Sequence, residues 1–170
     1  PEKCPIIPFV LDNIVEQIAE IETAAIWSKV IVGNRDLPIG RLIEVLDNAD
    51  WVSQGRKHLR EDGICPFCQK QTITDELKNQ LDAFFSGEYE QDVSLIKQFI
   101  GQYSSYTDEL LSRIKTLRTS LGSYPAAGIE ASKIDSIIEL LNGYFSKNKA
   151  EMLIKEKEPG RINQPQQQVQ

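Results

Sequence analysis

The sequence has 170 residues, enough for one or two small domains with a modest core. Its apolar fraction of 41% is ordinary for a globular protein, and three cysteines, an odd number, argue against a disulfide scaffold and for a reducing compartment such as the cytosol. A net charge of −6 repels a phosphate backbone, so direct nucleic-acid binding is not expected, and no apolar run reaches the roughly 20 residues that cross a membrane.

The first expected helix covers residues 8–32 and ends at Gly33-Asn34. Its apolar residues recur at spacings of three and four, which draws one stripe along a helix; they are Val10, Ile14, Ile18, Ile21 and Ala25. Pro38 then opens a short helix, and Trp51 begins another short turn or helix, in which it is expected to be a core residue.

A helical pattern returns after a turn-rich connection. Thr74 is a suitable N-cap, and the pattern continues to residue 121, with Gly87 and Gly101 as candidate breaks, so two rods are expected rather than one. A last long helix is expected from Ile134 to about residue 158. We therefore expect an all-α fold of five or six helices, some of them forming an antiparallel coiled-coil hairpin.

The same patterns suggest three segments along the chain. Residues 1–72 hold short helices and end in a cysteine turn, residues 73–158 hold long helices of coiled-coil type, and residues 159–170 form a polar tail. The opening proline and the glutamine-rich end look like cuts through a longer polypeptide. Basic residues occur in two runs, which we expect to be solvated helix faces, with a nucleic-acid patch as the alternative: Arg56, Lys57, His58 and Arg60, then Lys147, Lys149, Lys155 and Lys157.

Cys65-Pro66-Phe67-Cys68 is the motif with chemical specificity. Two thiols separated by two residues can converge on one tetrahedral Zn²⁺ at about 2.3 Å from each sulfur. A closed structural zinc site has four ligands, however, and neither Cys4 nor His58 is spaced as a second ligand pair. The same motif on a second molecule would complete the site, which predicts a homodimer that shares one zinc ion.

Two other interpretations of this motif stay open. It could be a thiol–disulfide redox pair, although no βαβ pattern flanks it. It could also be a reduced, metal-free turn. No phosphate-binding loop, nucleophile elbow or zinc-protease motif is present, and a single histidine leaves little material for acid–base chemistry, so this segment is not expected to be an enzyme.

The stretch from Ser28 to Tyr89 resembles a family of bacterial ABC/SMC-like P-loop ATPases in which a helical insertion separates the Walker A and Walker B halves. Four pieces carry the resemblance: IGRLI at 39–43, DWVSQG at 50–55, CPFCQ at 65–69, and LDAFF at 81–85 followed by Glu88-Tyr89. Residues 155–159 resemble the returning strand of that insertion more loosely.

The resemblance implies a parent chain that binds ATP and signals by conformational change, while neither Walker half lies in this segment. The family includes anticodon nucleases of antiphage defence, and some members carry a zinc hook. The segment would then join two ATPase protomers through a zinc-hook-like turn at Cys65 and Cys68. The alternative is a metal-free helical module that binds an effector or other partner protein.

Overall fold

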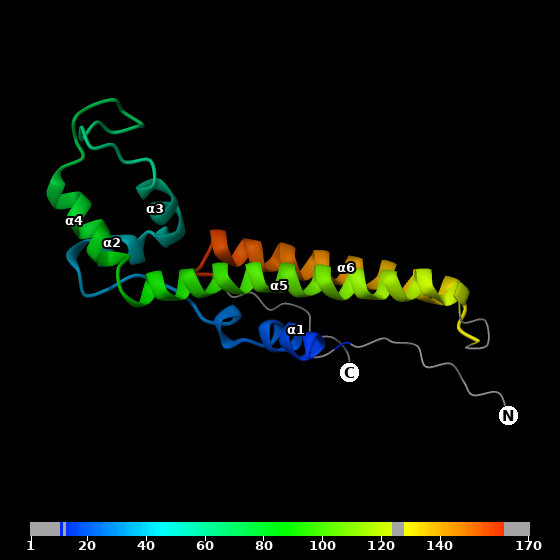
Figure 1. Cartoon of the computed structure of the whole chain (residues 1–170). Coiled ribbons are helices and arrows are strands. Elements are labelled where there is room, and N and C mark those ends of the chain that lie inside the picture. The colour runs from blue at the N-terminus through cyan, green and yellow to red at the C-terminus, as the bar shows by residue number, and fades with distance from the viewer. Residues whose placement is uncertain (1–10, 12, 124–127, 162–170) are drawn as a thin grey trace. The chain divides into compact units, whose positions relative to one another are not determined.

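The computed structural model describes residues 11, 13–123 and 128–161. Within those ranges it has six α-helices and no β-strand, which confirms the expected all-α fold. The helices are α1 (Ile14–Glu22), α2 (Pro38–Val45), α3 (Ala49–Arg56), α4 (Asp75–Phe84), α5 (Glu88–Ser120) and α6 (Ala131–Lys157), with 3₁₀ turns at Ala25–Trp27 and Leu121–Ser123 (Figure 1). None of the helices described is long and apolar enough to cross a membrane.

The first helix is shorter than the expected span of residues 8–32, of which 8–10 and 12 lie outside the described residues. The Thr23 hydroxyl donates to the Ala19 carbonyl at 2.8 Å, a back-bond that competes with helix continuation. Beyond it, Trp27 ends a single 3₁₀ turn and Ile31 lies in an irregular segment, and their side chains are 2% and 1% exposed. Burial of these side chains therefore outweighs the helical periodicity of the sequence.

The two expected rods after the cysteine turn are confirmed. The Thr74 hydroxyl accepts from the Leu77 amide at 3.2 Å and caps α4. The break falls at Gly87, whose φ of +66° a side chain would strain, whereas α5 runs through Gly101 without interruption. Of the two candidate glycines, only the one with a left-handed backbone ends a helix.

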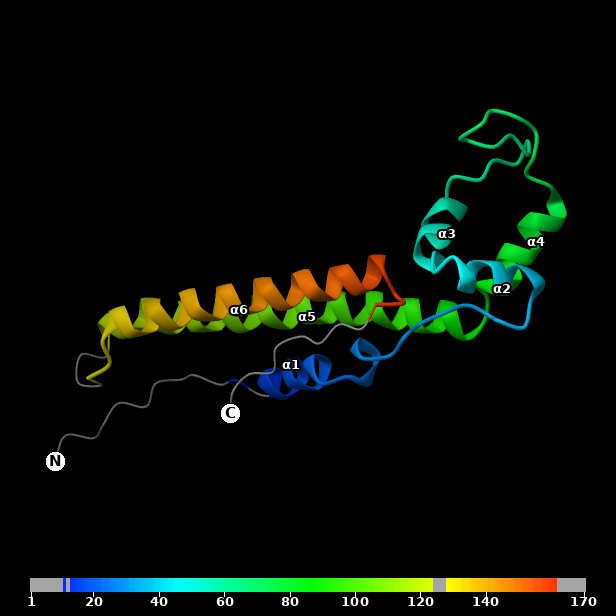
Figure 2. The same ribbon diagram turned by 180° about the vertical axis from the view of Figure 1, so that it is seen from behind.

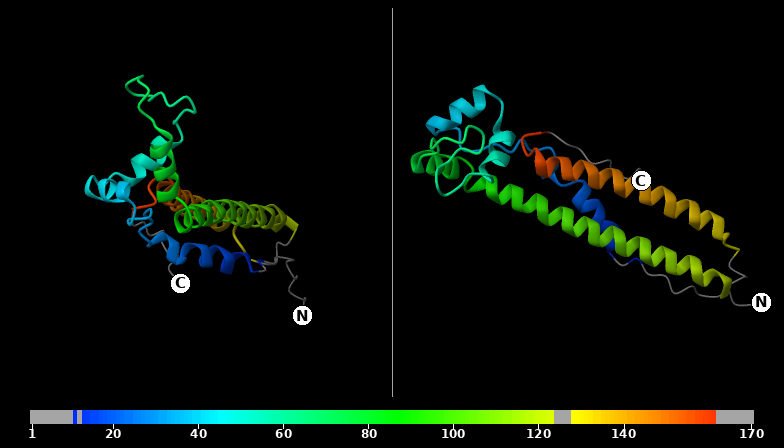
Figure 3. Two further views of the ribbon diagram at one scale, coloured as in Figure 1. Left: turned by 90° about the vertical axis from the view of Figure 1, so that its left-hand side faces the viewer. Right: turned by 90° about the horizontal axis from the view of Figure 1, so that it is seen from above.

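The chain divides into two compact units, and α5 and α6 each contribute to both. Unit 1 contains α1 and residues 98–152. Within it, α5 and α6 run side by side in opposite directions, as Figures 2 and 3 show. Tyr103 meets Phe145 edge to face with ring centroids 6.1 Å apart, and Arg118 pairs with both carboxylate oxygens of Asp135 at 2.9 and 3.0 Å. These contacts fix the register of an antiparallel helical hairpin.

A buried carboxylate sits at the centre of unit 1. Glu22 is 4% exposed and accepts three hydrogen bonds, from the Tyr103 hydroxyl at 2.8 Å, the Asn148 amide at 2.9 Å and the Tyr144 hydroxyl at 3.0 Å. Burial, more than the adjacent carboxylate, raises the pKa of Tyr144 to about 12 and raises that of Tyr103 further. Glu22 therefore ties α1 to both long helices through neutral donors.

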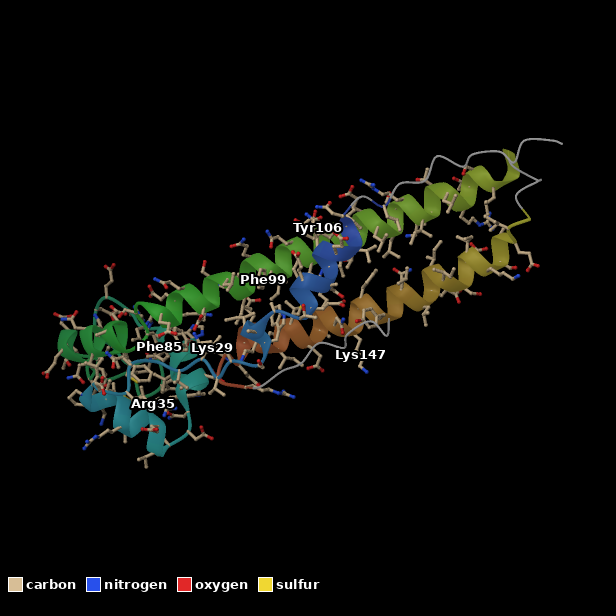
Figure 4. The ribbon with its side chains drawn as sticks, turned by 90° about the horizontal axis from the view of Figure 1, so that it is seen from below. Lys29, Arg35, Phe85, Phe99, Tyr106 and Lys147 are labelled. Atoms are coloured by element: carbon tan, nitrogen blue, oxygen red, sulfur yellow. The ribbon has the colours of Figure 1, made fainter. Side chains whose placement is uncertain are left out.

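Unit 2 contains residues 25–97 and 153–163, with α2, α3, α4, the start of α5 and the end of α6. Its core includes an aromatic chain: Phe85 meets Phe84 at 4.7 Å and Tyr89 at 4.9 Å, both edge to face. The Arg56 guanidinium lies over the Phe85 ring at 5.1 Å. Figure 4 labels Phe85 among these helices.

Lys155 corrects the expectation of a solvated basic face at the end of α6. Its side chain has no exposed surface, and its ammonium donates to the backbone carbonyls of Pro159, at 2.7 Å, and of Lys29 and Arg161. Burial lowers the pKa of Lys155. An ammonium has three donors, and here three carbonyls occupy them, so this lysine closes the end of α6 instead of meeting solvent.

Candidate metal centre

The two cysteines lie in the loop between α3 and α4, which Figure 1 shows standing away from those helices. A short antiparallel ladder supports the loop: Ile64 bridges to Gln71, the Cys65 amide donates to the Lys70 carbonyl at 2.8 Å, and the Ile73 amide donates to the Gly63 carbonyl at 3.0 Å. The chain turns back at Gln69, whose φ is +57°. The ladder and the turn hold the CPFC motif in one fixed bend.

Inside this bend the backbone is directed at the sulfur of Cys65. The Cys68 and Phe67 amides donate to it, in that order of importance, and they lower the pKa of the Cys65 thiol. The side chains of Cys68 and Thr72 reinforce this effect, and the Cys68 sulfur lies 3.9 Å from the Thr72 hydroxyl oxygen. Amide donors favour the thiolate, which is the form that binds a metal.

The thiols are free, one half-buried and one exposed. Across the described residues, no group of three or more His, Cys, Asp or Glu side chains is placed to hold a metal ion. Cys4 lies outside those residues, and His58 is exposed and lines a separate pocket. Two thiolates in a turn with amide-to-sulfur hydrogen bonds fit half of a tetrahedral zinc site, and the other half would have to come from elsewhere.

Two aromatic residues are exposed in this region, and one of them corrects the sequence interpretation. Trp51, expected in the core, is 61% exposed, because α3 buries none of its residues. Phe67, inside the CPFC motif, is 74% exposed. The two rings stack on each other instead, with centroids 6.0 Å apart and an interplanar angle of 26°. An exposed aromatic pair therefore lies beside the cysteine turn, and sequence periodicity gives no signal for it.

The family of this chain follows from its sequence as a whole. A family model described as an AAA domain matches residues 5–170. The chain belongs to the AAA domain family. Neither the curated proteins nor the solved structures include a match to it. As a member of this family, the chain is part of an AAA-type ATPase, and its described residues form the all-α portion set out above.

The lowered pKa of the Cys65 thiol predicts a faster reaction with alkylating reagents. In metal-free protein, Cys65 is expected to react with iodoacetamide faster at neutral pH than the same cysteine in unfolded chain, since a lowered pKa leaves more thiolate at a given pH. Mass spectrometry of alkylated peptides across a pH series gives the pH at which the alkylation rate of Cys65 reaches half its maximum. Chain unfolded in urea, where the amide donors are lost, is the control. Identical midpoints in folded and unfolded chain would contradict the assigned hydrogen bonds.

Proposed function

We propose that this chain is the helical insertion between the Walker halves of an ABC/SMC-like P-loop ATPase, and that it joins two protomers through a shared zinc ion. The AAA family match and the all-α structure support an accessory helical segment. The sequence has no phosphate-binding loop of its own, so the site of ATP hydrolysis would lie in other parts of the parent chain.

The observation that carries the proposal is the half-complete ligand set. Cys65 and Cys68 share one bend, amide donors favour the thiolate of Cys65, and no third ligand joins them in the described ranges. Zinc prefers four ligands in structural sites, and a second copy of the same turn supplies two more. Cys68 is exposed and Cys65 is half-buried, so the turn is open to a second copy.

Zinc content and solution mass, measured on one sample, test the proposal. The chain purified without chelator is expected to hold about half a zinc ion per chain and to have the mass of a dimer, because four thiolates from two chains surround one ion. Chelator should release the zinc and shift the mass to that of a monomer. A zinc-free chain would rule out the metal-bridged arrangement.

A metal-free module that binds a partner or effector protein is the second candidate. The stacked and exposed pair of Trp51 and Phe67 favours it, since exposed aromatic side chains are enriched where proteins bind each other. Under this alternative, chelator leaves the solution mass unchanged, and substitution of Trp51 abolishes partner capture while substitution of Cys65 does not.

For the parent chain we propose ATP-driven signalling in antiphage defence. This rests on the resemblance of residues 28–89 to the ATPases that include anticodon nucleases. In that setting, the insertion would couple the nucleotide state of two ATPase heads to an effector by holding the protomers together. A defence assay in cells, comparing the intact parent with one carrying Cys65→Ser, tests whether the turn is needed.

A further inference from the structure

Unit 2 contains a pocket that gathers cations from three separate stretches of sequence. It has a volume of about 630 Å³, and Lys57 comes to it from the end of α3, Lys97 from α5 and Lys157 from the end of α6. Pockets of about 300 to 1,000 Å³ are of the size that holds small-molecule ligands. One end of each basic run therefore reaches the same pocket, although 100 residues separate Lys57 from Lys157.

The charge around this pocket is opposite to that of the whole chain. Arg56, Lys57, Lys97 and Lys157 line it against two carboxylates, Glu90 and Glu156, in a protein whose net charge is −6. Arg56 is already engaged, with the Leu81 carbonyl at 3.3 Å and the Glu90 carboxylate at 3.8 Å. In the part of the chain that the structure describes, no ion pair involves any of the three lysines. Their charges are thus left for a ligand.

The walls of the pocket are held in place by hydrogen bonds. The Tyr89 hydroxyl donates to the Ser53 hydroxyl at 2.9 Å and joins α5 to α3. The Gln54 amide donates to the Lys157 carbonyl at 2.9 Å and joins α3 to the end of α6. The chain after α6 is held by two more hydrogen bonds. The Lys155 ammonium donates to the Pro159 carbonyl, and the Gly160 amide donates to the Asp50 carboxylate at 3.3 Å. The backbones that carry the lysines are therefore fixed before any ligand arrives, which lowers the entropic cost of binding.

We propose that this pocket binds a small, multiply charged phosphate ligand, such as the phosphate chain of a nucleotide or an inorganic polyphosphate. Ammonium groups bind phosphate oxygens through charge-assisted hydrogen bonds, and the hydroxyls of Ser53 and Ser94 add neutral donors at the same walls. The acidity of the surrounding chain disfavours a long polyanion, whose remaining phosphates would be repelled, and so selects a ligand that fits inside the pocket. The inference is independent of zinc.

Isothermal titration calorimetry on the full chain tests it with inorganic tripolyphosphate, ATP and single-stranded RNAs of two lengths as separate probes. Tripolyphosphate is expected to bind with one site per chain, more weakly as salt rises. Removing one lysine charge should weaken binding about fivefold, because one charge pair at about 4 Å in water contributes about that factor to the affinity; the variants are Lys57→Gln, Lys97→Gln and Lys157→Gln. Glu156→Gln removes a repulsive charge and should strengthen binding by a similar factor. ATP binding tighter than tripolyphosphate identifies a nucleotide; equal affinity identifies the phosphate chain alone.

The matched control is Lys147→Gln, an exposed lysine of α6 (labelled in Figure 4) that belongs to unit 1, whereas the residues that line the pocket belong to unit 2. It should leave the affinity unchanged. The substituted lysines of the pocket are exposed, so unchanged thermal melting of each variant excludes unfolding as the cause. Absence of tripolyphosphate binding, an equal loss in Lys147→Gln, or RNA binding that is tighter and grows with strand length would each overturn the proposal.

Discussion

Replacing Cys65 with serine is expected to remove both the zinc and the dimer from the purified chain. A serine hydroxyl is a poor zinc ligand, and in a symmetric pair one substitution deletes two of four thiolates. A structural zinc site has a binding free energy of roughly 10 to 16 kcal/mol. If the four ligands contribute equally, the loss of two ligands costs about 6 kcal/mol, or on the order of 10⁴-fold in zinc affinity. Atomic absorption and light scattering on the same sample measure metal and mass together.

Substitutions at Cys68 supply the matched comparison. Cys68→Ser should behave as Cys65→Ser does, whereas Cys68→His should retain part of the zinc, because an imidazole nitrogen is a zinc ligand. Recovery of zinc by histidine but not by serine distinguishes metal ligation from a structural need for a small side chain in the bend. A dimer that persists in Cys65→Ser without zinc would instead support the metal-free, partner-binding alternative.

Replacing Glu22 with alanine is expected to lower the free energy of unfolding by about 3 kcal/mol. The substitution removes the acceptor that the hydroxyls of Tyr103 and Tyr144 and the amide of Asn148 share, and the loss of one partner from a buried hydrogen bond costs about 1 to 3 kcal/mol. Relaxation around the shortened side chain recovers part of the sum of those costs. Urea denaturation followed by circular dichroism measures the change.

Two variants separate the hydrogen bonds of Glu22 from general effects on α1. Glu20→Ala removes an exposed carboxylate from the same helix and should change stability by less than about 0.5 kcal/mol. Glu22→Gln keeps one acceptor oxygen but places an amide donor next to other donors. The free energy of unfolding should therefore fall by more than in Glu20→Ala and by less than in Glu22→Ala. Equal losses in Glu20→Ala and Glu22→Ala would show that the buried network adds nothing to stability.

Interactions within a few residues made much of this molecule predictable. The proline that opens α2, the threonine that caps α4 and the left-handed glycine before α5 act on the backbone next to them, and each lies where its local chemistry requires. The bend around Cys65 is local too, since its ladder spans only residues 63 to 73. The candidate metal ligands were therefore visible in the sequence before any fold was known.

Features that depend on residues far away in the sequence could not be predicted from local patterns. The helical stripe predicted α1 as far as Val32, but burial of Trp27 and Ile31 ended it earlier. Glu22 carried one missed signal, a carboxylate on the apolar stripe of its own helix, yet its three donors come from residues 81 to 126 positions away. Sequence spacing cannot reveal which helix will supply a donor to a buried acceptor.

The sequence by itself determined an all-α chain with two long helices and one thiol bend, because helix periodicity, caps and turns are short-range properties of the backbone. Only the tertiary structure decided which polar groups are buried and which cations meet. Lys155 and Lys157 are two residues apart, but the first is enclosed by carbonyls and the second lines an open pocket with Lys57 and Lys97. Burial and charge clustering follow from packing between distant segments, and neighbouring residues in a helix face different surroundings.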